Sequence, residues 1–409
     1  MERKIDVWRN SVGGNFFFRP YCKEEGEEPK AFLFCYQSAW QKNLLMRYQT
    51  VVLLDATYKT TKYALPLFTL VVKTNVNYIN VGVFVVLHED TDSIAEALKI
   101  FQSWNPDWKP SYFLVDYSIP EMNAITICFP SCRIYICDFH RLQAWQRWLN
   151  TRTNVPRAKN AEELLKLFKK LAISRNDQEF LVAETKLYDS DSWKRNEKAQ
   201  KYFCSTWLPV KDKWTQSFFD REYLFIINTN NGNESQTKTL KYSYFRNHID
   251  KSLCGVLEII LTEYLSDALH TYQSSNSSLD SGYKNYNDAI PDFLYERPIS
   301  FIRHVYQRYA TAQSVYSRNS ITLVEDDSDA TFCRYVIKSE TNVGENHLID
   351  PSIPFCSCDD FFKYRFPCKH ICALILYIPD FSFHSLPSSY LGSPYITIDP
   401  IYSVFSNEF

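Results

Sequence analysis

Three consecutive apolar segments between residues 51 and 87 constrain the fold most strongly. VVLLDATY, LFTLVVKT and INVGVFVVL are rich in β-branched and aromatic residues, and turn residues separate them. Such segments are typical of buried strands, and their succession predicts a three-stranded meander. This part of the chain must build a sheet, and the elements that follow have to cover it.

Helical and strand patterns alternate after the meander. Residues 93–103 (SIAEALKIFQS) carry apolar side chains at helical spacing, and a second helix (PEMNAITICF) opens with Pro120. The short runs YFLVD and RIYIC predict strands, and FHRLQAWQRWL predicts a third helix. The order β-β-β-α-β-α-β-α predicts an α/β fold with a mixed sheet, flanked by helices, and it is the element order of the RNase H-like fold.

The rest of the chain divides by pattern and composition. The first 50 residues are mixed and end in a helical pattern, whereas QSSNSSLDSGYKNYND is polar enough for a linker. We predict a lead-in over 1–50, an α/β domain over 51–272 with a helical insertion at about 150–225, a linker over 273–291, a helical connector over 292–330, a cysteine-containing module over 331–380 and a tail over 381–409.

The charge of the chain is unevenly distributed. The net charge is −2, whereas dedicated duplex binders are usually basic. Residues 141–251 nevertheless contain 21 Lys and Arg against 13 Asp and Glu, a local excess of eight positive charges. Two interpretations stay open: a surface that faces phosphate groups, or lysines on solvated helix faces.

Cysteine spacing and hydropathy indicate a reduced compartment. Eight of the twelve cysteines are scattered singly among apolar neighbours, and the other four crowd between residues 356 and 372. Such clustering favours metal binding over disulfides. No stretch approaches the roughly 20 apolar residues of a membrane span, and the N-terminus lacks a signal peptide pattern. We therefore expect a soluble intracellular protein without membrane contacts.

Three acidic residues follow strands or turns where a catalytic site is expected. Asp55 ends the first strand of the meander and Asp116 ends the fourth strand, while Glu234 lies where a polar turn leads into a helix. Carboxylates at strand ends suit the few oxygen ligands that Mg²⁺ takes from proteins. Aspartate also favours turns for conformational reasons, and glutamate in a first helical turn is often only a partner of the helix dipole.

The four-ligand cluster is the most specific short motif. FCSCDDFFKYRFPCKHICAL contains Cys356-x-Cys358, nine intervening residues and Cys368-x-His370. Thiolates and imidazole are ligands that Zn²⁺ prefers, four of them in tetrahedral array, and a site without an open position is structural. Cys372 lies two residues beyond His370 and is expected in the core.

Several segments together resemble the Mutator-like element (MULE) transposases. LLDATYKTTKYALPLFTLVVKT, FLVDYSIPEMNAI, IYICDFHRLQAWQRW and TNNGNESQTKTLK resemble successive blocks of that family, over residues 51–241. The cysteine motif resembles the SWIM zinc finger of its animal relatives. The resemblance implies a DDE triad of Asp55, Asp116 and Glu234, and a C-x-x-H element at Cys137 and His140. That pair is either an additional metal or structural contact near the site, or a buried thiol and a strand-end histidine.

The resemblance also implies a function. We expect a nuclear, DNA-binding, transposase-derived protein whose triad would use Mg²⁺ or Mn²⁺ for strand cleavage and transfer, with Zn²⁺ as a structural ion. The alternative is a domesticated, non-catalytic factor that binds DNA or other proteins through the zinc finger. Relatives carry an N-terminal DNA-binding segment, and only 54 residues precede Asp55, which favours a fragment of a longer gene product.

Overall fold

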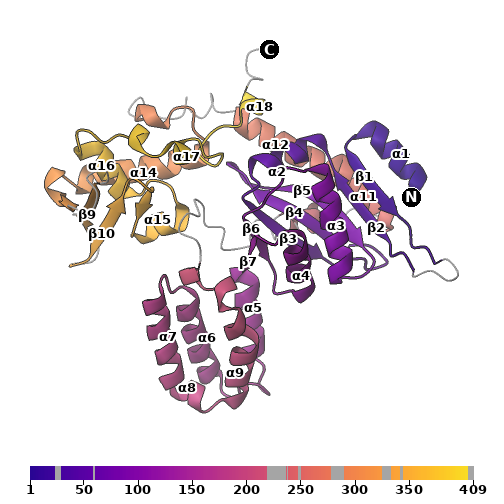
Figure 1. The fold of residues 1–409 in the computed structure, drawn as a ribbon, viewed down its shortest axis with the longest axis horizontal. Coiled ribbons are helices and arrows are strands. Elements are labelled where there is room, and N and C mark those ends of the chain that lie inside the picture. Colours follow the sequence, from indigo (N-terminus) through magenta and orange to yellow (C-terminus); the bar gives the residue numbers. More distant parts are fainter. Residues whose placement is uncertain are drawn as a thin grey trace. The chain divides into compact units, whose positions relative to one another are not determined.

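The computed structural model describes residues 1–23, 29–58, 60–218, 236, 238–246, 250–277, 290–324, 333–340 and 344–403. The chain forms two compact units (Figure 1). The first comprises Met1–Lys73, Tyr78–Asp220 and Ile227–Ala268, and the second comprises Thr74–Asn77, Arg221–Ile226 and Leu269–Phe409. None of the described helices is both long and apolar enough to cross a membrane.

A seven-stranded mixed sheet organises the first unit. Its strand order is β1-β2-β5-β4-β3-β6-β7, and β3, β6 and β7 run parallel while the other neighbours are antiparallel. The predicted mixed α/β architecture is therefore confirmed, including the order of strands and helices between residues 51 and 149. The strands are β1 (Asn15–Arg19), β2 (Leu33–Gln37), β3 (Val51–Thr57), β4 (Leu67–Lys73), β5 (Tyr78–Val86), β6 (Tyr112–Val115) and β7 (Arg133–Ile136).

Alternation along the strands divides the apolar side chains between two faces. Phe84 of β5 contacts Phe101, on the face where α3 and α4 lie (Figure 1). Its neighbours Val83 and Val85 belong to a different core cluster, with residues of the helices on the opposite face. The first face carries α3 (Thr91–Trp104) and α4 (Ile119–Cys128), and the second carries α1 (Glu2–Ser11), α11 (Leu253–Ile259) and the π-helix η5 (Ile260–Tyr264). The helix α2 (Ala39–Arg47) packs against β5.

Local sequence fixes where the covering helices begin. Asp90 caps α3 by accepting a hydrogen bond from the Ser93 amide at 2.8 Å, and Ser118 caps α4. Pro120 lies in the first turn of α4, where its missing N–H has no helical partner to lose. At Gly82, a Cβ atom would lie 2.7 Å from the Phe101 ring, so only glycine lets α3 approach β5 this closely.

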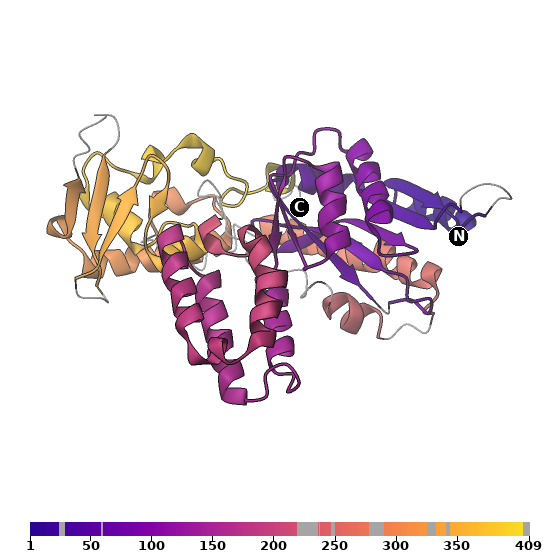
Figure 2. The ribbon, with the colours of Figure 1, turned by 60° about the horizontal axis from the view of Figure 1, so that its bottom comes forward.

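A helical insertion follows β7, as predicted. The third predicted helix, α5 (Asp138–Leu149), joins β7 to this insertion. The insertion's helices are α6 (Ala158–Ala172), α7 (Asp177–Asp189), α8 (Asp191–Lys194) and α9 (Glu197–Tyr202), which continues into η1 (Phe203–Trp207) and η2 (Leu208–Lys213). The helices lie side by side in both views (Figures 1 and 2). Trp145, Trp207 and Trp214 are at most 1% exposed and share one core with Phe168 and Phe203.

The second unit combines a small sheet with helices. The sheet has the order β11-β10-β9-β8 and is antiparallel throughout. Its strands are β8 (Ile321–Val324), β9 (Arg334–Lys338), β10 (Asn346–Asp350) and β11 (Phe355–Cys356). The principal helices are α14 (Ile299–Val315), α15 (Asp359–Tyr364) and α16 (Lys369–Tyr377), and α14 packs against α16.

Candidate metal centres

Two of the predicted acids lie on or directly after neighbouring parallel strands. Asp116 follows the last residue of β6, as predicted, whereas Asp55 lies inside β3, which continues to Thr57 rather than ending at the aspartate. Leu53 of β3 pairs with Leu114 of β6, and two further steps in the same register bring Asp55 level with Asp116. Neighbouring strands lie about 4.8 Å apart. Asp55 is only 7% exposed, whereas the side chain of Asp116 is 34% exposed. The register therefore aligns one buried and one accessible carboxylate at the same edge of the sheet.

A third acid, Glu121, lies beside these two aspartates. It occupies the first turn of α4, immediately after β6, and is only 2% exposed. Its Oε2 atom is buried and has no hydrogen-bond partner among the described residues. Burial first, and then the negative charges of Asp116, Asp55 and Glu89, raise the pKa of Glu121 well above its usual range. A bound cation would stabilise the ionised form of such an unpartnered carboxyl among other acids.

Asp116 also contacts the predicted C-x-x-H element. His140 lies in the first turn of α5 and forms an ion pair through Nδ1 with Oδ1 of Asp116. Burial lowers the pKa of His140, but hydrogen bonds to Asp116 and Cys137 outweigh burial and raise it to about 10. The ligand atoms of Asp116, Cys137 and His140 all lie within 4.8 Å of one another. A metal role for Cys137 and His140 stays a prediction.

Glu234, the third acid of the predicted triad, lies outside the described residues. The described Gln236, two positions later, donates through Nε2 to the backbone carbonyl of Tyr78 at 2.9 Å and accepts a hydrogen bond from the Tyr264 hydroxyl. Gln236 therefore attaches this segment to the beginning of β5. The position of Glu234 relative to Asp55 and Asp116 stays a prediction.

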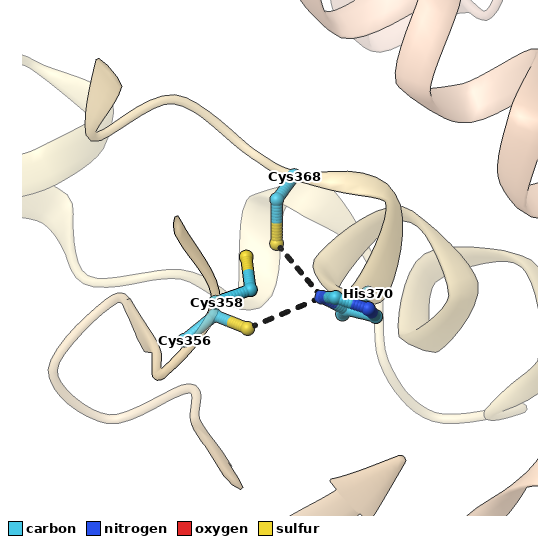
Figure 3. Close-up of side chains that lie close together, drawn as sticks. All are labelled: Cys356, Cys358, Cys368 and His370. Atoms are coloured by element: carbon cyan, nitrogen blue, oxygen red, sulfur yellow. Dashed lines mark hydrogen bonds between the residues drawn. The ribbon is translucent and has the colours of Figure 1, made fainter. Parts of the chain in front are cut away.

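The predicted zinc ligands converge in the second unit (Figure 3). The ligand atoms of Cys356, Cys358, Cys368 and His370 lie within 4.8 Å of one another, and each residue is at most 5% exposed. Nδ1 of His370 lies 3.5 Å from Sγ of Cys356 and 3.8 Å from Sγ of Cys368. Tetrahedral zinc with bonds of about 2.0–2.3 Å separates its ligands by roughly 3.5–3.8 Å. The donor set and its spacing therefore fit structural zinc, with Nδ1 as the histidine ligand.

Short local structures bring the four ligands together. Cys356 lies in β11 and pairs with Ile349 of β10, while Cys358 caps α15 by accepting a hydrogen bond from the Phe361 amide. Cys368 is the N-cap of α16, which places His370 in its first turn. Each ligand thus lies in a strand or at a helix start rather than in an irregular loop.

Electrostatics at this cluster favour a bound cation. Burial and the neighbouring thiols raise the pKa of Cys368, whereas hydrogen bonds from Cys356 and Cys368 lower the pKa of Cys358. Three thiols in a dry site do not ionise together unless a cation lies among them. Zinc supplies that charge, which is the usual reason for deprotonated thiol ligands.

Cys372 does not join the cluster, in agreement with the sequence analysis. It is fully buried, and burial raises the pKa of its thiol. It lies in α16, where its amide donates to the backbone carbonyl of Cys368. Its place is therefore one helical turn beyond the third ligand, in the core beside the metal site.

Two protein-family models match this chain, one over part of the first unit and one over the zinc-binding segment. Residues 21–135 match the family described as zinc finger SWIM domain-containing protein 1/3, RNaseH-like domain. Residues 340–379 match the SWIM zinc finger, which contains all four cysteine and histidine ligands. The chain carries an RNase H-like domain and a SWIM zinc finger. A search of curated proteins finds no match.

Glu121 was not among the site residues predicted from the sequence. Its position, three residues into a helix that follows a strand-end aspartate, was a usable signal, since the first turn of such a helix lies beside the strand end. A glutamate in a first helical turn is ordinarily an exposed partner of the helix dipole, and only the packing of α4 shows its burial. The pairing of Asp116 with His140 was likewise visible only in three dimensions.

Proposed function

We propose that the RNase H-like domain is derived from a MULE-type transposase and cuts or joins nucleic-acid strands with divalent metal ions. The parallel register that aligns Asp55 with Asp116 carries this proposal. Asp55 and Asp116 would hold the metal with Glu234 as the third acid, and the oxygen-only donor set suits Mg²⁺ or Mn²⁺. Such ions activate the attacking oxygen and stabilise the leaving oxygen in phosphoryl transfer.

The chain's own residues prepare this site in distinct ways. Asp55 is held rigidly within β3, while the more exposed Asp116 is accessible to a substrate phosphate. Glu121 adds a buried carboxyl with one oxygen that has no hydrogen-bond partner among the described residues, and this oxygen favours cation binding nearby. His140 holds one oxygen of Asp116, so it orients this carboxylate and competes for it with any metal.

The zinc finger has a separate role in this proposal. Its four-ligand set leaves no open position, so zinc stabilises the second unit and performs no chemistry. The surface that zinc holds in place is then available to DNA or to another protein. A nuclear site of action belongs to the same proposal, because DNA is the expected partner.

The rival function is a non-catalytic nucleic-acid or protein-binding factor. The ion pair between Asp116 and His140 favours this rival, because it already neutralises one acid of the predicted triad. The two alternatives differ in metal binding. A catalytic site must bind Mn²⁺ at Asp55 and Asp116, whereas a site that has lost its catalytic activity in a binding factor need not bind it.

Metal titration and strand cleavage test the proposal together. The zinc-loaded chain is titrated with Mn²⁺ by calorimetry and incubated with labelled single-stranded and duplex DNA. Asp55→Asn should weaken Mn²⁺ binding at least tenfold and abolish cleavage, since it removes a charged ligand. Asp107→Asn, at an exposed turn, is the matched control and should retain both. Mn²⁺ affinity unchanged by Asp55→Asn would overturn the catalytic proposal.

A further inference from the structure

A hollow in the first unit lies beyond the strand that carries Asp55. Its volume is 610 Å³, and it is bordered by the segment after β3, by the π-helix η4 (Leu240–Tyr244), by α11 and by the residues just before α11. The Lys62 amide donates to the Lys251 carbonyl at 2.9 Å and thereby ties the loop after β3 to the segment before α11. The lining residues used below are Thr60, Lys241, Tyr242, Phe245, Arg246 and Lys251.

The hollow is positively charged. Lys241, Arg246 and Lys251 line it and form no ion pair with an acid in the part of the chain that the structure describes. Asp250 is the single acid among the described lining residues, and Ser252 engages both of its oxygens, by its amide at 2.8 Å and its hydroxyl at 2.9 Å. Three cations and one carboxylate, which is already hydrogen-bonded to Ser252, therefore line the hollow. The excess of positive charge favours an anionic ligand.

Thr60 points to a ligand independently of this charge. It is only 5% exposed, and its hydroxyl oxygen is buried without a hydrogen-bond partner among the described residues. Buried hydroxyls are nearly always hydrogen-bonded, and a free one at the wall of a hollow is a donor for a bound group. A phosphate oxygen is an acceptor that suits both this hydroxyl and the neighbouring cations.

The aromatic side chains select among phosphate-containing ligands. Tyr242 is 68% exposed, and Phe245 is half-buried beside it at the wall of the hollow. An exposed ring next to cations is the arrangement with which proteins hold single strands, because a base stacks on the ring while its phosphate contacts lysine or arginine. Neither free phosphate nor a duplex with stacked bases would use that ring.

We infer that this hollow binds a single-stranded nucleic-acid segment, with phosphates at Thr60, Lys241, Arg246 and Lys251 and a base on Tyr242. Thr60 follows Asp55 by only five residues, so a strand held here lies beside the end of β3. The inference rests on the proposed nucleic-acid function of the same domain. It does not depend on metal-dependent cleavage, since none of these groups needs a metal to bind a strand.

Fluorescence anisotropy with a labelled single-stranded oligonucleotide of about 12 nucleotides tests the site, using the full zinc-loaded chain without Mg²⁺ or Mn²⁺. The Lys241→Glu/Arg246→Glu chain should bind at least tenfold more weakly. The magnitude of its log–log salt slope should fall by about 1.4, at roughly 0.7 for each lost phosphate contact. Tyr242→Ala should weaken binding by about five- to a hundredfold with an unchanged salt slope, because it removes stacking and no charge.

Lys194→Glu/Lys198→Glu is the matched control, since it makes the same charge change on the helical insertion. Lys194 pairs with Asp189 and Lys198 donates to the Thr153 carbonyl, so this variant should bind like the wild type. Equal losses in the control and in the Lys241→Glu/Arg246→Glu chain would overturn the inference. An unaffected Tyr242→Ala chain, with binding displaced by millimolar inorganic phosphate, would also overturn it by indicating a simple anion site. Retained strand binding in an Asp55→Asn chain that no longer cleaves supports it.

Discussion

At the scale of single residues, burial without a partner is the most informative property of this chain. Glu121 and Thr60 are polar side chains in the first unit that are at most 5% exposed, and each has an oxygen without a hydrogen bond among the described residues. Leaving such a group unsatisfied costs about 1–3 kcal/mol. The two groups lie at the acid cluster and at the basic hollow, which are the places where we propose a cation and a phosphate.

His304 in α14 supplies a prediction at this scale. Burial and the positive charge of Arg308 lower the pKa of His304 to about 4, although Asp360 opposes them. The unfolded chain takes up a proton near pH 6.5 and the folded chain only near pH 4. The stability that neutral His304 provides is therefore present above pH 6.5 and lost as the pH falls towards 4. We expect a loss of about 1–2 kcal/mol after allowing for solvent screening.

Chemical denaturation of the wild type and a His304→Gln chain between pH 4 and 7.5 measures this effect. The glutamine side chain does not titrate, so its chain should lose less stability on acidification than the wild type does. Comparing the two chains removes the acid-dependent loss of zinc, which both share. Parallel stability curves for the two chains would show that His304 titrates normally.

At the scale of elements, local patterns were readable in the sequence and long-range pairing was not. The strands and helices between residues 51 and 149 were predicted in order, because each has its own periodicity and turn residues. The strands β1 and β2 lie within the predicted lead-in and were not predicted as strands. Their five-residue segments show no alternation of buried and exposed positions, so they lack the period-two pattern that identifies a strand. Phe34 of β2 pairs with Val85 of β5, and no local pattern encodes a partner so distant in sequence.

The same distinction separates the two candidate sites. The zinc ligands lie within 15 residues, so their spacing alone identified the donor set. The acid cluster gathers Asp55 from β3, Asp116 from the residue after β6 and Glu121 from α4, and its membership depends on how α4 packs. Sequence patterns therefore singled out Asp55 and Asp116 but not the glutamate that packing buries beside them.

The helical insertion gives a prediction at the element scale. Trp145 is completely buried, contacts the rings of Phe168, Trp207 and Trp214, and lies under the Arg141 guanidinium at 4.8 Å. Trp145→Ala should destabilise the insertion by about 3–5 kcal/mol, because it leaves a cavity that several rigid rings cannot fill. Urea denaturation followed by tryptophan fluorescence measures it.

Leu181→Ala is the control for that experiment. Leu181 belongs to α7 of the same insertion but is 55% exposed, so its loss should change stability by no more than about 0.5 kcal/mol. Similar destabilisation by both substitutions would indicate that the insertion has no rigid core around Trp145.

At the scale of the whole molecule, the chain distributes stability between two units that rely on different interactions. The first unit buries apolar side chains on both faces of a seven-stranded sheet and in the helical insertion. The second has a four-stranded sheet with short strands, and its four metal ligands connect β11, α15 and α16. A small sheet of this kind gains much of its stability from the metal, because a bound ion adds its binding free energy to folding.

Zinc removal should therefore act on one unit and spare the other. In calorimetric unfolding, Cys368→Ser should lower the transition of the second unit by more than about 10 °C and leave the transition of the first unit in place. Each kcal/mol lost shifts a unit of this size by roughly 2–4 °C, and structural zinc supplies several kcal/mol.

Cys372→Ser is the matched control: this cysteine is equally buried in α16 but outside the ligand cluster, so its chain should keep one zinc per molecule. A Cys368→Ser chain that retains a full equivalent of zinc by metal analysis would show that the ligand set is wrong. Parallel loss of both transitions would instead show that the units unfold together, with zinc stabilising the whole chain.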